Sequence, residues 1–172
     1  LNCQYNLAGH AEKLNVQPPR ATTKLDVIKG VTYSANGHLC TLSLGNNAVR
    51  RFTYDKITSL LSTIETWPGA PDIAAPLQNL KYTLDPVGNI YALEDFGQQG
   101  LDDSANSKPP TITRYSYDGV YRLKTAGKGL VGDMEPTEYL ESYEHDAQGN
   151  VLTPSLESPD EKWTRTTAYS AP

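Results

Sequence analysis

One short pattern recurs along this chain, and an internal repeat limits the possible folds more than any other sequence feature. An apolar or aromatic residue is followed by a spacer, a residue that is usually Tyr, and then Asp, Asn or Ser. Gly or a substitute comes three residues after that, followed by a polar and an aliphatic residue. The Asp-equivalent positions of the six full copies are 6, 34, 55, 85, 118 and 146, and a seventh copy begins at Thr167. We therefore treat the chain as an array of short repeated units.

The repeat has the chemistry of a tight turn. Asp85-Pro86-Val87-Gly88 matches a type I turn followed by a left-handed residue, because a short acceptor, a Pro and a Gly each occupy their preferred place. Such a turn closes a β-hairpin with a bulge. The predicted turn residues are Asp55, Asp85, Gly88, Asp118, Asp146 and Gly149. In the third and fifth copies Thr58 and Tyr121 stand where Gly is expected, so we expect these two turns to close differently.

The residues around each turn favour strands. Tyr and aliphatic residues alternate with polar ones, as in Leu80–Leu84 and Thr111–Tyr117, which is typical of β-structure. A single hairpin cannot bury its apolar face, so we predict an all-β chain of antiparallel hairpins stacked side by side in one continuous sheet. We expect one module over residues 1–172, cut from a longer array, with a mobile polar loop near 97–110. Residues 135–143 are expected to hold one helical turn.

Composition excludes several classes of function. The net charge is −5 and the largest basic cluster is Arg50-Arg51, which argues against binding to nucleic acid. The longest apolar runs are far too short to insert a helix into a membrane. The two cysteines, Cys3 and Cys40, cannot form a four-cysteine zinc site, and whether they are bridged stays open.

The repeat resembles the YD repeats of the Rhs family, found in bacterial toxins and teneurin-type proteins. Three segments carry the likeness to the B and C components of insecticidal toxin complexes: Asn79–Asp95, Tyr115–Leu123, and Tyr143–Val151 followed by Trp163-Thr-Arg165. Their order is most similar to the C-terminal part of the B component. Asn6, Ser34 and Leu84 depart from the family pattern, and the self-cleavage motif of the C component is not found.

The resemblance implies a fold and a function. In that family the hairpins form a continuous curved sheet that closes into a hollow shell around a toxic polypeptide. We therefore expect a structural segment of a secreted shell that is not an enzyme, has no cofactor, and whose partners are other shell components and an enclosed polypeptide cargo.

Two other functions compete with the shell. Tyr54, Tyr82, Tyr117 and Tyr143 are candidate ladder residues in the sheet, or ligand-facing aromatics of a secreted carbohydrate-binding module, because aromatic faces suit sugars as well as cross-strand packing. A hydrolase would need two carboxyl groups facing one cleft, and Glu94-Asp95 and Asp102-Asp103 are the candidates. Neighbouring residues on a strand point to opposite faces, which argues against either pair acting alone.

The histidines do not form a recognisable catalytic or metal motif. His10 and His38 occupy the same place after their turns, and His145 stands where other copies have Tyr. Neither H-x-H nor H-E-x-x-H spacing is present. We therefore expect turn-flanking or packed histidines, no catalytic residue and no metal site.

Overall fold

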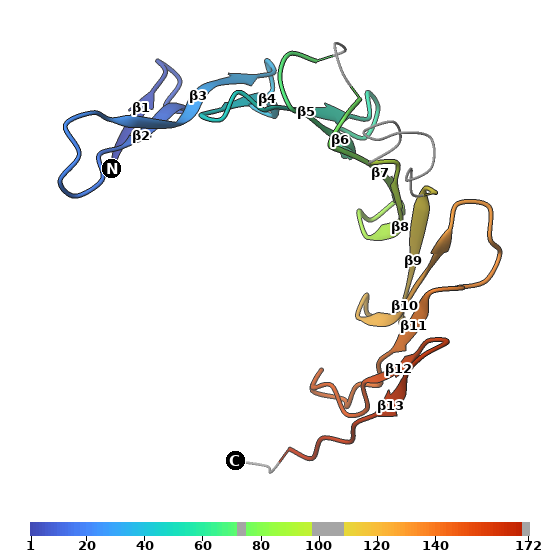
Figure 1. Ribbon diagram of the computed structural model, residues 1–172. Coiled ribbons are helices and arrows are strands. Elements are labelled where there is room, and N and C mark those ends of the chain that lie inside the picture. The colour runs from blue at the N-terminus through green and yellow to red at the C-terminus, as the bar shows by residue number, and fades with distance from the viewer. Residues whose placement is uncertain (72–74, 98–108, 170–172) are drawn as a thin grey trace. The chain divides into compact units, whose positions relative to one another are not determined.

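The computed structural model describes residues 1–71, 75–97 and 109–169. Regular structure in these residues consists of strands. They are β1 (Asn2–Tyr5), β2 (Ala11–Val16), β3 (Leu25–Tyr33), β4 (Leu39–Leu44), β5 (Val49–Tyr54), β6 (Leu61–Trp67), β7 (Gln78–Leu84), β8 (Ile90–Asp95), β9 (Thr111–Tyr117), β10 (Leu123–Leu130), β11 (Tyr139–Ser142), β12 (Ser155–Glu157) and β13 (Lys162–Thr164). The strand order in the sheet is the chain order (Figure 1). The predicted all-β array of antiparallel hairpins is confirmed.

The contacts between Cα atoms divide the chain into two compact units. Among the described residues, the first unit holds residues 1–80 and Gly97, and the second holds 81–96 and 109–169. In the first unit each strand from β1 to β6 pairs antiparallel with the next one. In the second unit the same holds from β8 to β13. Each unit is thus a meander of hairpins.

The repeats place their turns at the strand connections. The copies at 6, 34, 55, 85 and 118 connect β1 to β2, β3 to β4, β5 to β6, β7 to β8 and β9 to β10, respectively. The sixth copy is flanked by a single bridge between His145 and Val151. The register shifts by one residue next to the turn in four of these hairpins, which is the bulge that a type I turn with a left-handed residue requires.

Very little of the described chain is buried. The buried apolar residues are Ala48 and Trp67 in the first unit and Ala92, Ile112 and Ala126 in the second. Thr66 is the buried polar residue. A meander that forms a single layer leaves its two faces without a second layer to pack against, so the apolar core consists of three alanines, one Ile and one Trp among the described residues.

The helical turn predicted at 135–143 is wrong, because the amides of Thr137 and Glu138 donate to the Lys128 carbonyl, at 3.1 and 2.9 Å, and so pair with β10 instead of with their own segment. The loop predicted near 97–110 lies almost wholly outside the described residues. No helix in the described part of the chain is long and apolar enough to cross a membrane.

Candidate functional site

The turn of the fourth repeat shows the geometry that the sequence pattern predicts locally. Asp85 Oδ1 accepts hydrogen bonds from the amides of Val87, at 3.0 Å, and Asn89, at 2.9 Å. The Gly88 amide donates to the Asp85 carbonyl, at 3.0 Å, and Gly88 has φ +95°. Asn89 closes the ring by donating its side-chain amide to Asp85 Oδ2, at 2.8 Å. The Asp85 carboxylate thus accepts three hydrogen bonds from its own turn.

The sixth repeat has the same arrangement. Asp146 Oδ1 accepts from the Asn150 amide and Oδ2 from the Asn150 side chain, both at 2.8 Å, and Gly149 has φ +94°. The side-chain hydrogen bond from the Asn is the main reason that the pKa of Asp85 and that of Asp146 lie below the ordinary value. Both carboxyl groups are therefore used as structural acceptors.

The first two repeats make the turn without a carboxylate. Asn6 Oδ1 accepts from the amides of Ala8 and His10, and Ser34 Oγ accepts from the amide of His38. Gly9 and Gly37 both have φ +80°. A neutral short acceptor therefore supports the same backbone, although it lacks the second carboxylate oxygen that Asn89 and Asn150 use.

The two turns without Gly differ from each other. In the third repeat the loop is one residue longer, the Asp55 amide donates to Leu60, and Ser59 takes the positive φ of +59°. The fifth turn instead closes like the others, and here the expectation of a different closure is wrong. Tyr121 itself adopts φ +66° and donates its amide to the Asp118 carbonyl, at 3.0 Å. The hydrogen bonds around Asp118 offset the cost of a left-handed Tyr.

Replacing Gly149 with valine tests the turn directly. A Cβ at Gly149 would meet no atom within 4 Å, so the cost arises from the backbone conformation alone. We expect the free energy of unfolding to fall by about 1–2 kcal/mol. Gly119→Val is the matched control, because Gly119 also lies in open space but has no positive φ. Equal effects of the two substitutions in a denaturant titration would contradict the turn assignment.

A second recurring contact joins four of the repeats to the one before. The residue just before the Asp-equivalent, here called the ladder position, is Tyr in several copies. Its hydroxyl donates to a backbone carbonyl five residues after the Asp-equivalent of the preceding copy. The four bonds run from Tyr33 to Ala11 (2.7 Å), Tyr54 to Leu39 (3.0 Å), Tyr117 to Ile90 (2.9 Å) and Tyr169 to Val151 (3.1 Å). Two of these bonds lie within each unit.

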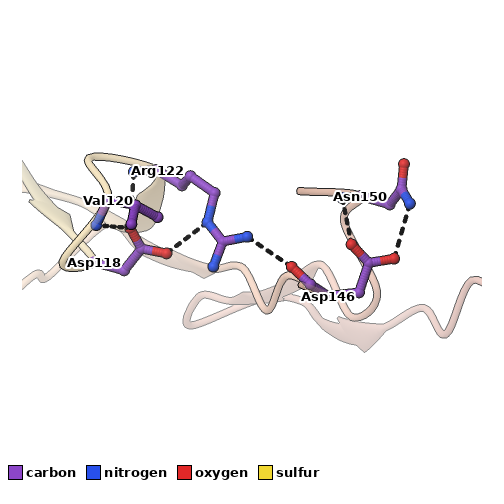
Figure 2. A network of polar contacts seen from close by, with 5 residues as sticks. All are labelled: Asp118, Val120, Arg122, Asp146 and Asn150. Carbon is purple, nitrogen blue, oxygen red and sulfur yellow. Dashed lines mark hydrogen bonds and ion pairs between the residues drawn. The ribbon is translucent and has the colours of Figure 1, made fainter. Parts of the chain in front are cut away.

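The ladder lacks a Tyr in two copies, and one of them shows a replacement. Leu84 has no hydroxyl group to donate, and His145 occupies the ladder position of the sixth repeat. There Arg122 donates from Nε to Asp118 Oδ2, at 2.6 Å, and from Nη1 to the Asp146 carbonyl, at 2.7 Å. Figure 2 shows the guanidinium lying between the two turns. Arg122 thus connects the fifth and sixth repeats.

Tyr117→Phe removes one ladder bond and keeps the ring. The Ile90 carbonyl then loses its partner in a half-buried setting, so we expect a loss of about 1 kcal/mol in the free energy of unfolding. Tyr91→Phe is the control, since Tyr91 is 56 % exposed. The account would be wrong if both variants unfolded at the same denaturant concentration.

Asp118 gives the ladder an acid-dependent component. The Arg122 amide, followed by the Arg122 side chain and the Val120 amide, lowers the pKa of Asp118 from 3.8 to about 2. A lowered pKa means that the stabilisation is complete above pH 4 and is lost as the pH falls through about 2. In Asp118→Asn the side-chain oxygen that accepts the two backbone amides is retained, as in Asn6, but the titration of the carboxyl group is absent. The difference in unfolding free energy between the two proteins should shrink between pH 4 and pH 2. A constant difference over that range would contradict the assignment.

The remaining candidate tyrosines and the histidines have other positions. Tyr143 donates to Glu141 Oε2, at 3.0 Å, and Tyr82 is half-buried in β7. The rings of His10 and His38 pack on the ladder tyrosines of the next repeat, Tyr33 and Tyr54, with 4.6 Å between centroids in each pair. These histidines are therefore packed between repeats rather than clustered with one another.

Of the two candidate carboxylate pairs, the structure describes Glu94-Asp95. Glu94 makes an ion pair with Lys81, at 2.8 Å, and Asp95 follows it on the same strand. Asp102-Asp103 lies outside the described residues. The described ranges contain no group of three His, Cys, Asp or Glu side chains that could hold a metal. Cys3 and Cys40 are free thiols.

Three glycines outside the repeat are essential for packing, and the sequence pattern did not single them out. A Cβ at Gly45 would overlap the carbonyl oxygen of Asp26, and one at Gly127 would overlap the Pro136 ring. A Cβ at Gly129 would lie 2.9 Å from Thr137 Oγ1. The contacts come from residues distant in sequence, so only the folded chain shows them.

The structure thus defines a class: a β-hairpin array in which short acceptors fix the turns and ladder bonds join neighbouring repeats at four places. No protein-family model matches the chain. Two curated proteins of Yersinia entomophaga are similar in sequence, the toxin subunits YenC2 (31 % identical over 147 residues) and YenC1 (28 % over 144 residues). Each alignment covers 73 % of this chain and 15 % of the relative, so the chain spans a small part of the relatives' length.

Solved structures show the same fold. The Photorhabdus luminescens Tc holotoxin pore matches with a TM-score of 0.71 and 24 % identity over 95 % of this chain and 8 % of that one. The crystal structure of TcdB2-TccC3 matches with a TM-score of 0.71 and 25 % identity, over 95 % of this chain and 9 % of that one. The chain is therefore related to toxin-complex proteins, and the resemblance stated from the repeat is confirmed. Both curated relatives carry the name YenC, whereas the segment order in the sequence favours the B component.

Proposed function

We propose that this segment is a section of the wall of a toxin-complex shell that encloses a polypeptide cargo. The observation that carries the proposal is the ladder bond, repeated with the same donor and acceptor positions in both units. Such a bond holds neighbouring hairpins together without requiring a second layer. A chain built this way suits a thin wall better than a globule with a packed core.

The proposal includes partners and location. One matching structure is a complex of TcdB2 with TccC3, and a second also includes Cdc42. By analogy, we propose that other shell components complete the wall to which this segment belongs and that the assembly acts outside the producing cell. Whether the segment corresponds to the B or the C component, the proposed role in the wall is the same.

We assign no catalytic reaction to this segment. The four turn aspartates, Asp55, Asp85, Asp118 and Asp146, accept hydrogen bonds from their own turns, and the pKa of each is lowered by these bonds. A general acid needs a raised pKa, so these carboxyl groups are poorly suited to that task. The hydroxyls of Tyr54 and Tyr117 donate to backbone carbonyls, which also supports a structural role over sugar binding.

Protease protection tests this function. The full-length protein, purified with its partner component, is digested with a broad-specificity protease, and the products are identified by mass spectrometry. We expect a polypeptide that survives in the intact assembly and is degraded once denaturant opens the wall. If every segment outside the repeats is degraded at the same rate in both conditions, no cargo is enclosed and the proposal fails.

A further inference from the structure

The inference concerns how one repeat selects the next, and it holds whether or not the wall encloses a cargo. The residue four places after each Asp-equivalent, here called the post-turn position, lies at the boundary with the following repeat. In the first two repeats it is His10 and His38, and each ring packs on the ladder Tyr of the next repeat, at 4.6 Å with an interplanar angle of 35°. The same two positions thus meet with the same geometry twice.

The post-turn residue also depends on its own turn. Where the turn has a carboxylate, as in repeats four to six, the post-turn residues Asn89, Arg122 and Asn150 donate a side-chain hydrogen bond to its Oδ2. Where the turn has Asn6 or Ser34, the post-turn residue is His. In these three repeats the post-turn residue correlates with the ladder residue of the next repeat. Asn89 and Asn150 are followed by Tyr117 and Tyr169, whereas Arg122 is followed by His145.

Arg122 and His145 differ from the other pairs, because the post-turn side chain is long and the ladder position ahead holds no Tyr. A surface cavity of about 380 Å³ lies beside this pair, and both Arg122 and His145 line it. Arg122 extends along this boundary and reaches the Asp146 carbonyl, at 2.7 Å (Figure 2). The Asn side chains at the same position are shorter and bind their own turn.

We propose that the post-turn position and the ladder position ahead of it form one complementary docking site for the following hairpin. In the first, second, fourth and sixth repeats a short or flat post-turn side chain takes a Tyr, whose hydroxyl binds the preceding repeat. The third repeat, with its longer turn, has Leu84 ahead of it and lies outside this rule. A post-turn Arg takes a smaller residue, and its guanidinium supplies the bond between repeats that the Tyr would make. The double substitution Arg122→Asn with His145→Tyr should therefore be tolerated, whereas each substitution alone should weaken the contact between the two repeats.

Each single exchange has a defined physical defect. In Arg122→Asn the Asp146 carbonyl loses its guanidinium donor while the cavity beside His145 grows. In His145→Tyr we expect the phenol to enter the cavity that the guanidinium also lines, and to compete with the bond from Arg122 to Asp146. The double variant recreates the combination of Asn89 with Tyr117, in which the Tyr hydroxyl donates to the preceding repeat at 2.9 Å.

A double-mutant cycle in the full-length protein tests the proposal. Hydrogen exchange is measured by mass spectrometry on peptides that contain Tyr143, Gly149 and Asn150, whose amides bond to Lys124 O, Asp146 O and Asp146 Oδ1. We expect each single variant to speed exchange by about tenfold, the change that corresponds to losing one hydrogen bond of about 1.4 kcal/mol. The double variant should exchange within about threefold of the parent protein, because the two effects are coupled.

A third single variant separates charge from bridging. Arg122→Lys keeps the positive charge but cannot present two donors in the planar geometry of a guanidinium, so it should behave like Arg122→Asn. The proposal is overturned if the double variant shows the product of the two single effects, or if His145→Tyr alone leaves exchange unchanged. The proposal is also overturned if the double variant fails to fold while either single variant folds.

Discussion

Gly45→Ala is expected to lower the free energy of unfolding by about 3 kcal/mol, since overpacking at a rigid contact costs this much. The new Cβ would overlap the Asp26 carbonyl oxygen, a backbone atom that cannot rotate away. Gly45 also donates its amide to the Val27 carbonyl, at 2.9 Å, so moving its backbone breaks that bond. The substitution therefore separates two parts of the first unit that the native chain holds in contact. Urea unfolding followed by far-ultraviolet circular dichroism measures the loss.

Gly30→Ala is the matched control for this prediction. Gly30 lies in β3 and pairs with Ser43 of β4, but a Cβ there would meet no atom within 4 Å. Alanine is less flexible than glycine in the unfolded chain, so this variant should be as stable as the parent or slightly more stable. A similar loss in both variants would show that the strands merely disfavour alanine, and would contradict the close approach at Gly45.

Trp67→Ala is expected to have an effect of about 3–4 kcal/mol, the range for removing a buried Trp side chain. Trp67 is 3 % exposed and is the largest member of a core that otherwise consists mainly of alanines. The Arg51 guanidinium lies over its ring, 4.8 Å from the centroid, and loses this contact in the variant. Few other side chains in the first unit are buried enough to compensate.

The second Trp of the chain provides the control. Trp163 lies in β13 and is 42 % exposed, so Trp163→Ala should cost much less than Trp67→Ala. Each variant also isolates the fluorescence of the remaining Trp, and the emission of Trp67 should lie at the shorter wavelength because its ring is away from water. Equal losses of stability, or a solvent-like emission from Trp67, would contradict the packing described here.

The sequence predicts the local parts of this structure well. The turn at Asp85 could be predicted because its four residues determine their own backbone, and the strands on either side follow from alternation. The relationship to toxin-complex proteins could be found for the same reason, since the repeat is a local pattern. The fifth turn could not be predicted. Only the hydrogen bonds that Asp118 makes with Val120 and Arg122 explain how Tyr121 is held at a positive φ.

The long-range contacts could not be predicted from the sequence. A ladder bond such as Tyr33 to Ala11 joins residues 22 apart, and its acceptor is a backbone atom that every residue carries. The replacement of a Tyr by Arg122 is equally hidden, because the Asp146 carbonyl that it binds gives no signal in the sequence. The packing of Pro136 against Gly127 depends on a loop that folds back on β10, a long-range contact that the local sequence does not show, so the helical turn predicted there was wrong.

Electron cryo-microscopy of the full-length protein assembled with its partner component tests the central claim most directly. The account predicts a closed wall of β-hairpins around additional density. Residues 1–71, 75–97 and 109–169 should be traceable as hairpins in that wall, with the hydroxyls of Tyr33, Tyr54 and Tyr117 on the carbonyls of the preceding repeats. A segment that instead packs against a globular core, with no enclosed volume beside it, would contradict the account.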